Sequence, residues 1–471
     1  MAGLGKSSIT WTISLRADDD PEIIFGGSFF CSRSTGLAAQ RDIRCVIPTL
    51  AQLLARQSPE FSVALAAELA LDPDVLEQQV EAQVRKLLYK PLGALRGAPR
   101  PVLFVIDALD ECGGETGNEA LDNCDSHRIV SDVLEALVAL FCTEHRLPVK
   151  FLVTSRPETH IRDTPVSDEM FSKVLRLHTV DKDEITADIR LYIANQLSST
   201  PRLRSQFTTA DYDSLVRVCD GIFIVAATAL RYTLDGGRDR AAVRFRTLLD
   251  ASKGTLSINA AAPLDRMYSV ILSDAASTDE LPALRQALAA ILVARMSLSV
   301  SALADLLEVT TADILATLSF LHSVIHVPDD DDDDEASLRP LHASFGDYLF
   351  ERAPSHIRLA ESLGHEVLAP ACLRLMKRRL YFNIMQAKSS YEPNALTRPD
   401  SVTLALEYAC LHWIHHVSAQ GTRMDDTISE IFFSRLLAWL EVMSGLGEVS
   451  RAAAMMIFAA ATVGAAHHQR S

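Results

Sequence analysis

The first 180 residues alternate short apolar or β-branched runs with longer stretches of helical character. Two of the short runs, residues 102–106 and 151–153, are continuously apolar, as strands buried on both faces of a parallel sheet should be. The alternation therefore predicts a doubly wound α/β domain. Its strands are expected at residues 22–31, 101–107, 149–155 and 173–178.

Beyond about residue 180 the pattern becomes helical, as in residues 184–197, where apolar positions recur every three or four residues. One exception is an acidic run, residues 329–335, flanked by the apolar pieces 321–327 and 338–341. Because neighbouring carboxylates repel one another, we expect this run to form the solvated tip of a hairpin, as in the wing of a winged helix. A divalent-cation site is the alternative, but the run lacks the spaced ligands and glycine turn of a calcium loop.

Composition narrows the class of protein. A chain of 471 residues is long enough for several domains, and its net charge of -16 argues against a broad surface for nucleic acid or anionic membrane. The eight cysteines form no C-x-x-C pair, so we expect reduced thiols and a cytoplasmic protein. The longest uncharged apolar stretch, residues 452–466, is too short for a membrane span and is expected to be a packed helix.

The first residues contain a phosphate-loop pattern. Residues 1–7 read M-A-G-L-G-K-S and match the last seven positions of G-x-x-x-x-G-K-[ST], so the first glycine and its strand would precede Met1. In such a loop the backbone amides surround the phosphates, Lys6 reaches the β and γ oxygens, and the Ser7 hydroxyl coordinates Mg²⁺. The helix that follows, from Ser8 onwards, favours the anion at its N-terminus. Taken alone, the three residues G-K-S are equally compatible with an ordinary turn.

A second pattern follows the predicted strand 101–107, which ends in Asp107 and is followed by Asp110 and Glu111. Ligands of open α/β sheets bind at the carboxyl ends of the strands, so Asp107 is placed to hold Mg²⁺, commonly through water. Glu111 is placed to orient or deprotonate an attacking water. An acidic loop that closes an unremarkable strand is the structural alternative.

A third pattern, K-F-L-V-T-S-R-P at residues 150–157, is a further buried strand that ends in a polar turn with Arg156. An arginine at this position can sense a γ-phosphate and stabilise developing negative charge. A solvated arginine without a role is the alternative.

The three motifs GLGKS, LFVIDALDEC and FLVTSRPE, in this order and spacing, resemble the NACHT domains of the STAND class of signalling NTPases. The resemblance is strongest to the fungal NOD-like proteins often described as nephrocystin-3-like. Residues 220–229, 263–268 and 341–349 are similar to the helical and winged-helix segments of that family. The resemblance implies an α/β P-loop NTPase core that lacks its first strand, followed by mostly α-helical domains that include a winged helix. The implied division is 1–180, the NTPase core; 181–260, a helical domain; 261–355, the winged helix with its acidic wing loop 329–335; and 356–471, a C-terminal helical region.

The resemblance also assigns residues. Phosphate and Mg²⁺ would be held by Gly3, Gly5, Lys6, Ser7 and Ser8. Asp107 would be the Walker B acid with Mg²⁺, Asp110 and Glu111 the acidic pair of the catalytic site, and Arg156 its sensor.

His342, in the stretch LHASFGDYL, matches the winged-helix histidine that contacts the β-phosphate of ADP in relatives. From the residues alone, a histidine beside Phe345 and Leu349 is more often a satisfied core residue. The sequence departs from many animal relatives at residues 221–223, G-I-F, where those have G-x-P near the adenine.

The implied function is an ATP/ADP-dependent signalling switch with slow ATP hydrolysis, self-association on activation and an unknown effector. In fungal relatives such switches serve nonself recognition or cell death. Two alternatives stay open: a turnover ATPase of the AAA type, and a non-hydrolysing scaffold or fragment.

A final pattern is the trio His412, His415 and His416, whose i, i+3, i+4 spacing could place ligands for a metal on one helix face. No acidic or cysteine partner follows it, so plain helical structure is the favoured interpretation. His467 and His468, near the C-terminus, need no role.

Overall fold

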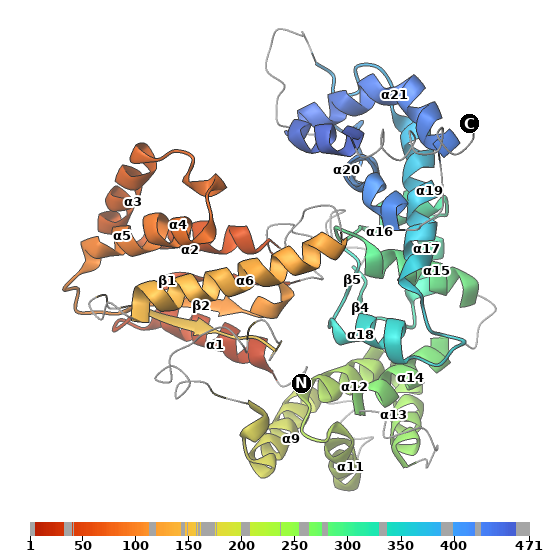
Figure 1. The fold of residues 1–471 in the computed structure, drawn as a ribbon. Coiled ribbons are helices and arrows are strands. Elements are labelled where there is room, and N and C mark those ends of the chain that lie inside the picture. Colours follow the sequence, from red (N-terminus) through yellow and green to blue (C-terminus); the bar gives the residue numbers. More distant parts are fainter. Residues whose placement is uncertain are drawn as a thin grey trace. The chain divides into compact units, whose positions relative to one another are not determined.

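The computed structural model describes residues 5–32, 40, 42–112, 119–142, 147, 149–156, 158, 161, 175, 177–198, 208–235, 237–253, 263–275, 281–328, 337–387, 399–419 and 425–457. Gly3, the acidic run 329–335 and the pair His467 and His468 therefore lie outside the described residues. The chain divides into two compact units, Met1–Ala227 and Thr228–Ser471 (Figure 1).

The first unit is built on a parallel sheet of three strands in the order β1-β2-β3. The strands are β1 (Ile24–Phe30), β2 (Val102–Asp107) and β3 (Val149–Val153). They confirm three of the four predicted strands, and the continuous apolar run of β2 is buried in the centre of the sheet, as expected. The fourth predicted strand, residues 173–178, is wrong where it can be checked. Leu177–Thr179 forms a 3-10 turn that leads directly into the next helix, which begins at Lys182. Residues 173, 174 and 176 lie outside the described residues.

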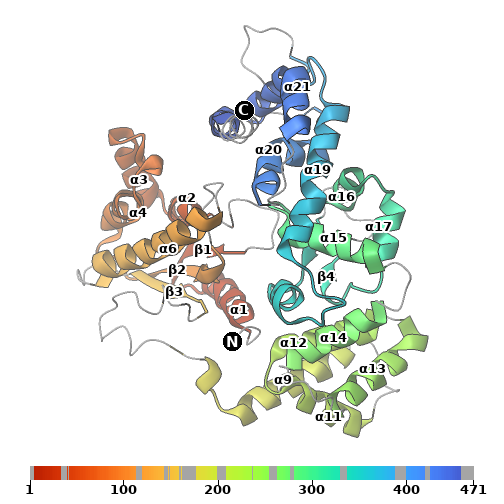
Figure 2. The same ribbon diagram turned by 45° about the vertical axis from the view of Figure 1, so that its right-hand side comes forward.

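Helices cover both faces of this sheet (Figure 1 and Figure 2). On one face, α2 (Val46–Gln57) and α6 (Glu119–Cys142) share a hydrophobic core with Val102, Phe104 and Ile106 of β2. Side chains of a strand alternate between faces, so Val105 and Asp107 project to the other face, where α1 (Lys6–Asp19) packs. The alternation of side chains along β2 thus directs the Asp107 carboxylate towards α1. Three further helices extend the first face: α3 (Pro59–Leu71), α4 (Val80–Gln83) and α5 (Lys90–Leu92).

The described residues of the first unit beyond residue 180 are mostly helical, as predicted. It contains α9 (Lys182–Ser198), α11 (Thr209–Cys219) and the start of α12 (Phe223–Asp235). Helix α11 begins with a capping box, in which the Thr208 hydroxyl accepts from the Asp211 backbone amide and the Asp211 carboxylate accepts from the Thr208 amide. An ion pair between Arg190 and Asp213 joins α9 to α11.

In its described residues, the second unit consists of packed helices and a small hairpin. Strands β4 (Ile325–His326) and β5 (Arg339–Pro340) pair antiparallel and flank the acidic run, which agrees with the predicted hairpin. The helices are α13 (Gly237–Lys253), α14 (Pro263–Ala275), α15 (Leu281–Val293), α16 (Val300–Leu307), α17 (Thr311–Leu318), α18 (Ser344–Asp347), α19 (Glu361–Arg379), α20 (Leu404–Ala419) and α21 (Asp425–Gly445). None of the helices within the described residues is long and apolar enough to cross a membrane.

Close helix packing positions the start of α19. A Cβ atom on Gly364 would come within 2.5 Å of the Ala289 carbonyl oxygen of α15, so only glycine allows this approach. Helix α19 also packs along α20, with which it encloses apolar side chains such as Leu368 and Trp413. The neighbour of Gly364, His365, is consequently held in the interior of the second unit, where it is 3% exposed.

Candidate functional site

The N-terminus of α1 has the backbone form of an anion site. Gly5 precedes the helix with φ of 84°, a left-handed conformation that glycine adopts without strain. Helix α1 has no side-chain cap at this end, so the first amides of the helix are not occupied by a capping oxygen. Lys6 begins the helix and Ser7 follows in the first turn, and within the described residues neither side chain makes a hydrogen bond or ion pair.

Asp107 ends β2 directly beside that first turn. The Thr10 hydroxyl lies 2.9 Å from Asp107 Oδ1 and 2.8 Å from the Lys6 carbonyl oxygen, so it joins the carboxylate to the first turn of α1. Both Thr10 and Asp107 are buried, 0% and 2% exposed. A buried carboxylate needs donors, and Thr10 supplies one of them. Thr10 was not predicted from the sequence; its signal is the spacing of four from Lys6, which places both residues on one face of a helix.

Thr154 supplies the other donor and fixes the loop after β2. Its hydroxyl accepts from the Ala108 backbone amide at 3.0 Å and donates to the Asp107 carboxylate. Its carbonyl oxygen accepts from the Leu109 amide at 3.0 Å. Ala108 itself has φ of 52°, a left-handed conformation that costs a residue with a Cβ about 1 to 2 kcal/mol. Thr154 was also missed, although it stands at the carboxyl end of the neighbouring strand, where polar side chains of a parallel sheet converge.

Arg156 is paired with the two acids that follow Asp107. Its backbone amide donates to Asp110 Oδ1 at 2.8 Å, and its Nε lies 3.3 Å from Asp110 Oδ2. One terminal nitrogen of the guanidinium lies 3.7 Å from Glu111 Oε1. The Asp110 side chain is only 6% exposed, so the positive charge of Arg156 compensates a carboxylate that is removed from water. The structure thus brings Asp110, Glu111 and Arg156 together in the loops that follow β2 and β3, close to Asp107 at the end of β2.

Two thiols lie close to these acids. Cys31 hydrogen-bonds Cys112, and this contact together with burial raises the pKa of the Cys31 thiol, as does the charge of Asp107. Six of the eight cysteines, those whose side chains the structure describes, are free thiols: Cys31, Cys45, Cys112, Cys219, Cys372 and Cys410. This agrees with the expectation of reduced cysteines, and a neutral Cys31 adds no charge to the site.

His342 belongs to the second unit, where it stands just before α18. Its Nδ1 accepts from the Ser344 backbone amide at 3.2 Å and lies 2.6 Å from the Ser344 hydroxyl. Because a backbone amide can only donate, the neutral ring carries its proton on Nε2. The Ser344 hydroxyl in turn contacts the Tyr268 hydroxyl at 2.9 Å, and burial raises the pKa of Tyr268 to about 12. The imidazole is therefore oriented by a chain of hydrogen bonds within its own unit.

Residues 1–156 match the family model described as Nephrocystin 3, N-terminal. This span includes Lys6, Asp107 and Arg156 and about a third of the chain. A comparison with curated proteins found no match. The family match agrees with the resemblance of the first 156 residues to nephrocystin-3-like proteins.

Proposed function

We propose that the first unit binds ATP and ADP with Mg²⁺, and that the chain is the nucleotide-dependent signalling switch of a NACHT-type STAND protein. The observation that carries the proposal is the link between Asp107 and Thr10. It places the acid that ends the central strand against the helix turn that carries Gly5, Lys6 and Ser7. An anion-binding helix N-terminus beside a carboxylate at a strand end is the arrangement that phosphate and Mg²⁺ need.

The residues present fit a magnesium nucleotide. Mg²⁺ prefers oxygen ligands, and Ser7 and Asp107 offer a hydroxyl and a carboxylate. When bound, the ion would neutralise phosphate charge; the amides after Gly5 and the ammonium of Lys6 would hold the phosphate oxygens. Ser8, the third residue of α1, and Gly3, which lies outside the described residues, belong to the same proposed cradle.

Arg156 supports a slow hydrolysis step. Its guanidinium is shared between Asp110 and Glu111, so its approach to a γ-phosphate would require exchange of those carboxylates for phosphate oxygens. The carboxylates freed in this way would orient or deprotonate a water. A step that needs this exchange fits a switch that hydrolyses ATP rarely better than a turnover ATPase.

His342 is the proposed contact of the second unit with bound ADP. Its Nε2-H is a donor, and its Nδ1 is fixed by Ser344, so the ring is preorganised to donate to a phosphate oxygen. Loss of this contact on exchange of ADP for ATP would release the second unit, permit self-association and engage an effector that is unknown. We propose that this protein is cytoplasmic.

A titration of the full chain with a fluorescent ADP analogue in the presence of Mg²⁺ tests the nucleotide site. Lys6→Ala is expected to weaken binding about 100-fold, because it removes a charged hydrogen bond to phosphate. Arg16→Ala is the matched control, since Arg16 lies in the last turn of the same helix. Equal affinity of Lys6→Ala and the wild type would overturn the proposal.

A second experiment separates the switch from its alternatives. In a switch, His342→Ala should release ADP faster and increase self-association, whereas the exposed His356→Ala should change neither. A turnover ATPase would show rapid steady-state hydrolysis that His342→Ala leaves unchanged. A non-hydrolysing scaffold would show no ATP hydrolysis, and His342→Ala would not change its self-association.

A further inference from the structure

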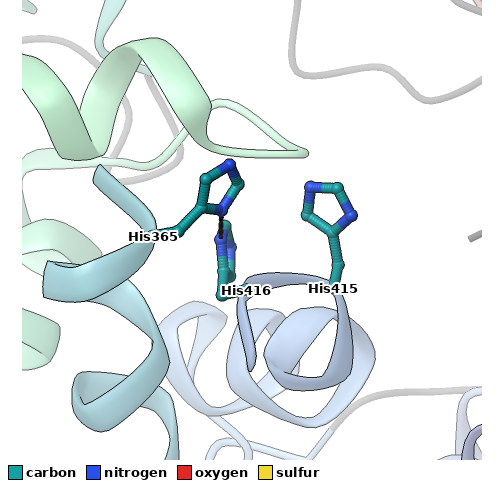
Figure 3. Close-up of side chains that lie close together, drawn as sticks. All are labelled: His365, His415 and His416. Atoms are coloured by element: carbon teal, nitrogen blue, oxygen red, sulfur yellow. Dashed lines mark hydrogen bonds between the residues drawn. The ribbon is translucent and has the colours of Figure 1, made fainter. Parts of the chain in front are cut away.

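Three histidines of the second unit meet in its interior. His365 comes from α19, and His415 and His416 from the C-terminal part of α20; they are 3%, 7% and 0% exposed. His365 and His416 are 51 positions apart in the sequence. Figure 3 shows the His365 ring extending from its helix towards the two rings on the neighbouring helix.

The rings form a nearly regular triangle. Their centroids are separated by 5.3 Å (His365 and His415), 5.1 Å (His365 and His416) and 5.3 Å (His415 and His416). One nitrogen from each ring lies within 4.8 Å of the others, and Nδ1 of His365 is 2.9 Å from Nδ1 of His416. Nitrogens bound to a tetrahedral zinc ion at about 2.0 to 2.1 Å lie about 3.4 Å apart. The observed range brackets this spacing.

A neighbouring hydroxyl orients one of the rings. The Tyr408 hydroxyl lies 2.7 Å from Nε2 of His416 and accepts from the Arg295 backbone amide at 3.3 Å. Tyr408 thus holds Nε2 outwards, which turns Nδ1 of His416 towards His365. Metal-binding histidines commonly have such a partner on the second ring nitrogen.

His412 is not part of the triangle. Its Nδ1 accepts from Arg451 at 3.1 Å, and its ring lies tilted against the Tyr408 ring, with the two centroids 5.0 Å apart. The trio suggested by the spacing in the sequence is consequently replaced by a different trio, in which α19 contributes the third ring.

We propose that His365, His415 and His416 bind one divalent transition metal ion of the zinc class, with the fourth position taken by water or hydroxide. Three imidazoles with an open position are a donor set that zinc accepts. The ion ties α19 to α20 and so stabilises the second unit.

A cobalt titration of the untagged full chain tests this site directly. All proteins carry His467→Gln and His468→Gln, so that these two neighbouring histidines cannot bind the ion, and are first stripped with a chelator. We expect one equivalent of Co²⁺ to give the intense visible bands of tetrahedral nitrogen coordination, and Zn²⁺ to displace it. Absence of binding, or only the weak bands of octahedral oxygen coordination, as carboxylates would give, overturns the proposal.

Substitutions locate the ion. His365→Gln and His415→Gln should each weaken binding more than about 100-fold, and Tyr408→Phe about 10- to 100-fold. His412→Gln is the matched control, because His412 is equally buried on the same helix but directed elsewhere, and should bind as tightly as the parent. Equal losses in His412→Gln and His415→Gln would contradict the proposal. Circular dichroism checks that each variant folds. If a variant does not fold, the cobalt titration of the parent protein alone decides whether the ion binds.

Discussion

Two buried polar clusters, one in each unit, satisfy the same physical requirement in different ways. In the first unit Asp107 and Asp110 are removed from water, and each is met by donors: Thr10 and Thr154 for the one, Arg156 for the other. In the second unit the buried histidines contact one another, the Tyr408 hydroxyl and the Arg451 guanidinium. Burial lowers the pKa of His412, His415 and His416, so these groups give up their charge.

The difference teaches what a buried ionisable group requires. An Asp that stays charged in the interior depends on its partners, so removal of one partner should be costly. A histidine that becomes neutral needs no counterion, but its stability becomes dependent on pH, because the unfolded chain can still take up the proton. The following predictions test this contrast, from the largest expected effect to the smallest.

Arg156→Met should destabilise the first unit by about 2 to 3 kcal/mol, because it leaves the Asp110 carboxylate buried without its counterion. Urea denaturation measures the change. Arg100→Met is the control, since Arg100 is exposed and donates to the Pro21 carbonyl oxygen, not to a buried carboxylate. Adding Asp110→Asn to Arg156→Met should restore most of the loss; no restoration would mean that the charge of Asp110 is not the cause.

Between pH 7.5 and pH 5 the wild type should lose about 2 kcal/mol more stability than His412→Gln. Burial, followed by the charge of Arg451, lowers the pKa of His412, so below about pH 6.5 only the unfolded chain binds this proton. The contribution of the neutral ring is present at pH 7.5 and is lost as the pH falls. Urea denaturation at both pH values measures it, and equal losses in the two proteins would show that His412 is not buried in the neutral form.

Thr154→Val should cost about 1.5 kcal/mol, because it removes the acceptor of the Ala108 amide and a donor to Asp107 at the same time. Thr12→Val is the control: the Thr12 hydroxyl also makes a hydrogen bond, to the Ser8 carbonyl oxygen, but on the exposed side of α1. Its loss should be within about 0.5 kcal/mol. If both variants lose the same amount, Thr154 does not fix the loop.

The smallest effect has the opposite sign. Ala108→Gly should stabilise the first unit by up to about 1 kcal/mol, because glycine adopts the left-handed conformation of this position without strain. Ala66→Gly, at an exposed position inside α3, should instead destabilise by about 1 kcal/mol. Thermal unfolding measures both, and equal signs would contradict the strain at Ala108.

The sequence allowed much of the first cluster to be predicted, because its acids stand at the ends of strands. The apolar run before Asp107 marks β2, and the parallel sheet then brings the carboxyl ends of β2 and β3 together. Thr10 and Thr154 could not be selected in advance, because threonine is common and only the packing of α1 on the sheet shows which hydroxyls reach the carboxylate.

The second cluster could not be predicted from its motif. The spacing of His412, His415 and His416 suggested one helix face, but whether a buried ring points at its neighbours depends on the helix it packs against. His365 joins the cluster only because Gly364 lets α19 approach α15 closely. Such contacts between distant segments carry no local pattern in the sequence.

The central claim is that Asp107 and the start of α1 act together on one magnesium nucleotide. Calorimetric titration of ADP with and without Mg²⁺, on the wild type and on Asp107→Asn, tests it most directly. Mg²⁺ should strengthen ADP binding about tenfold or more in the wild type and have little effect in Asp107→Asn, because the variant loses the carboxylate charge that holds the ion. An equal effect of Mg²⁺ on both proteins, or no ADP binding by the wild type, would contradict the account.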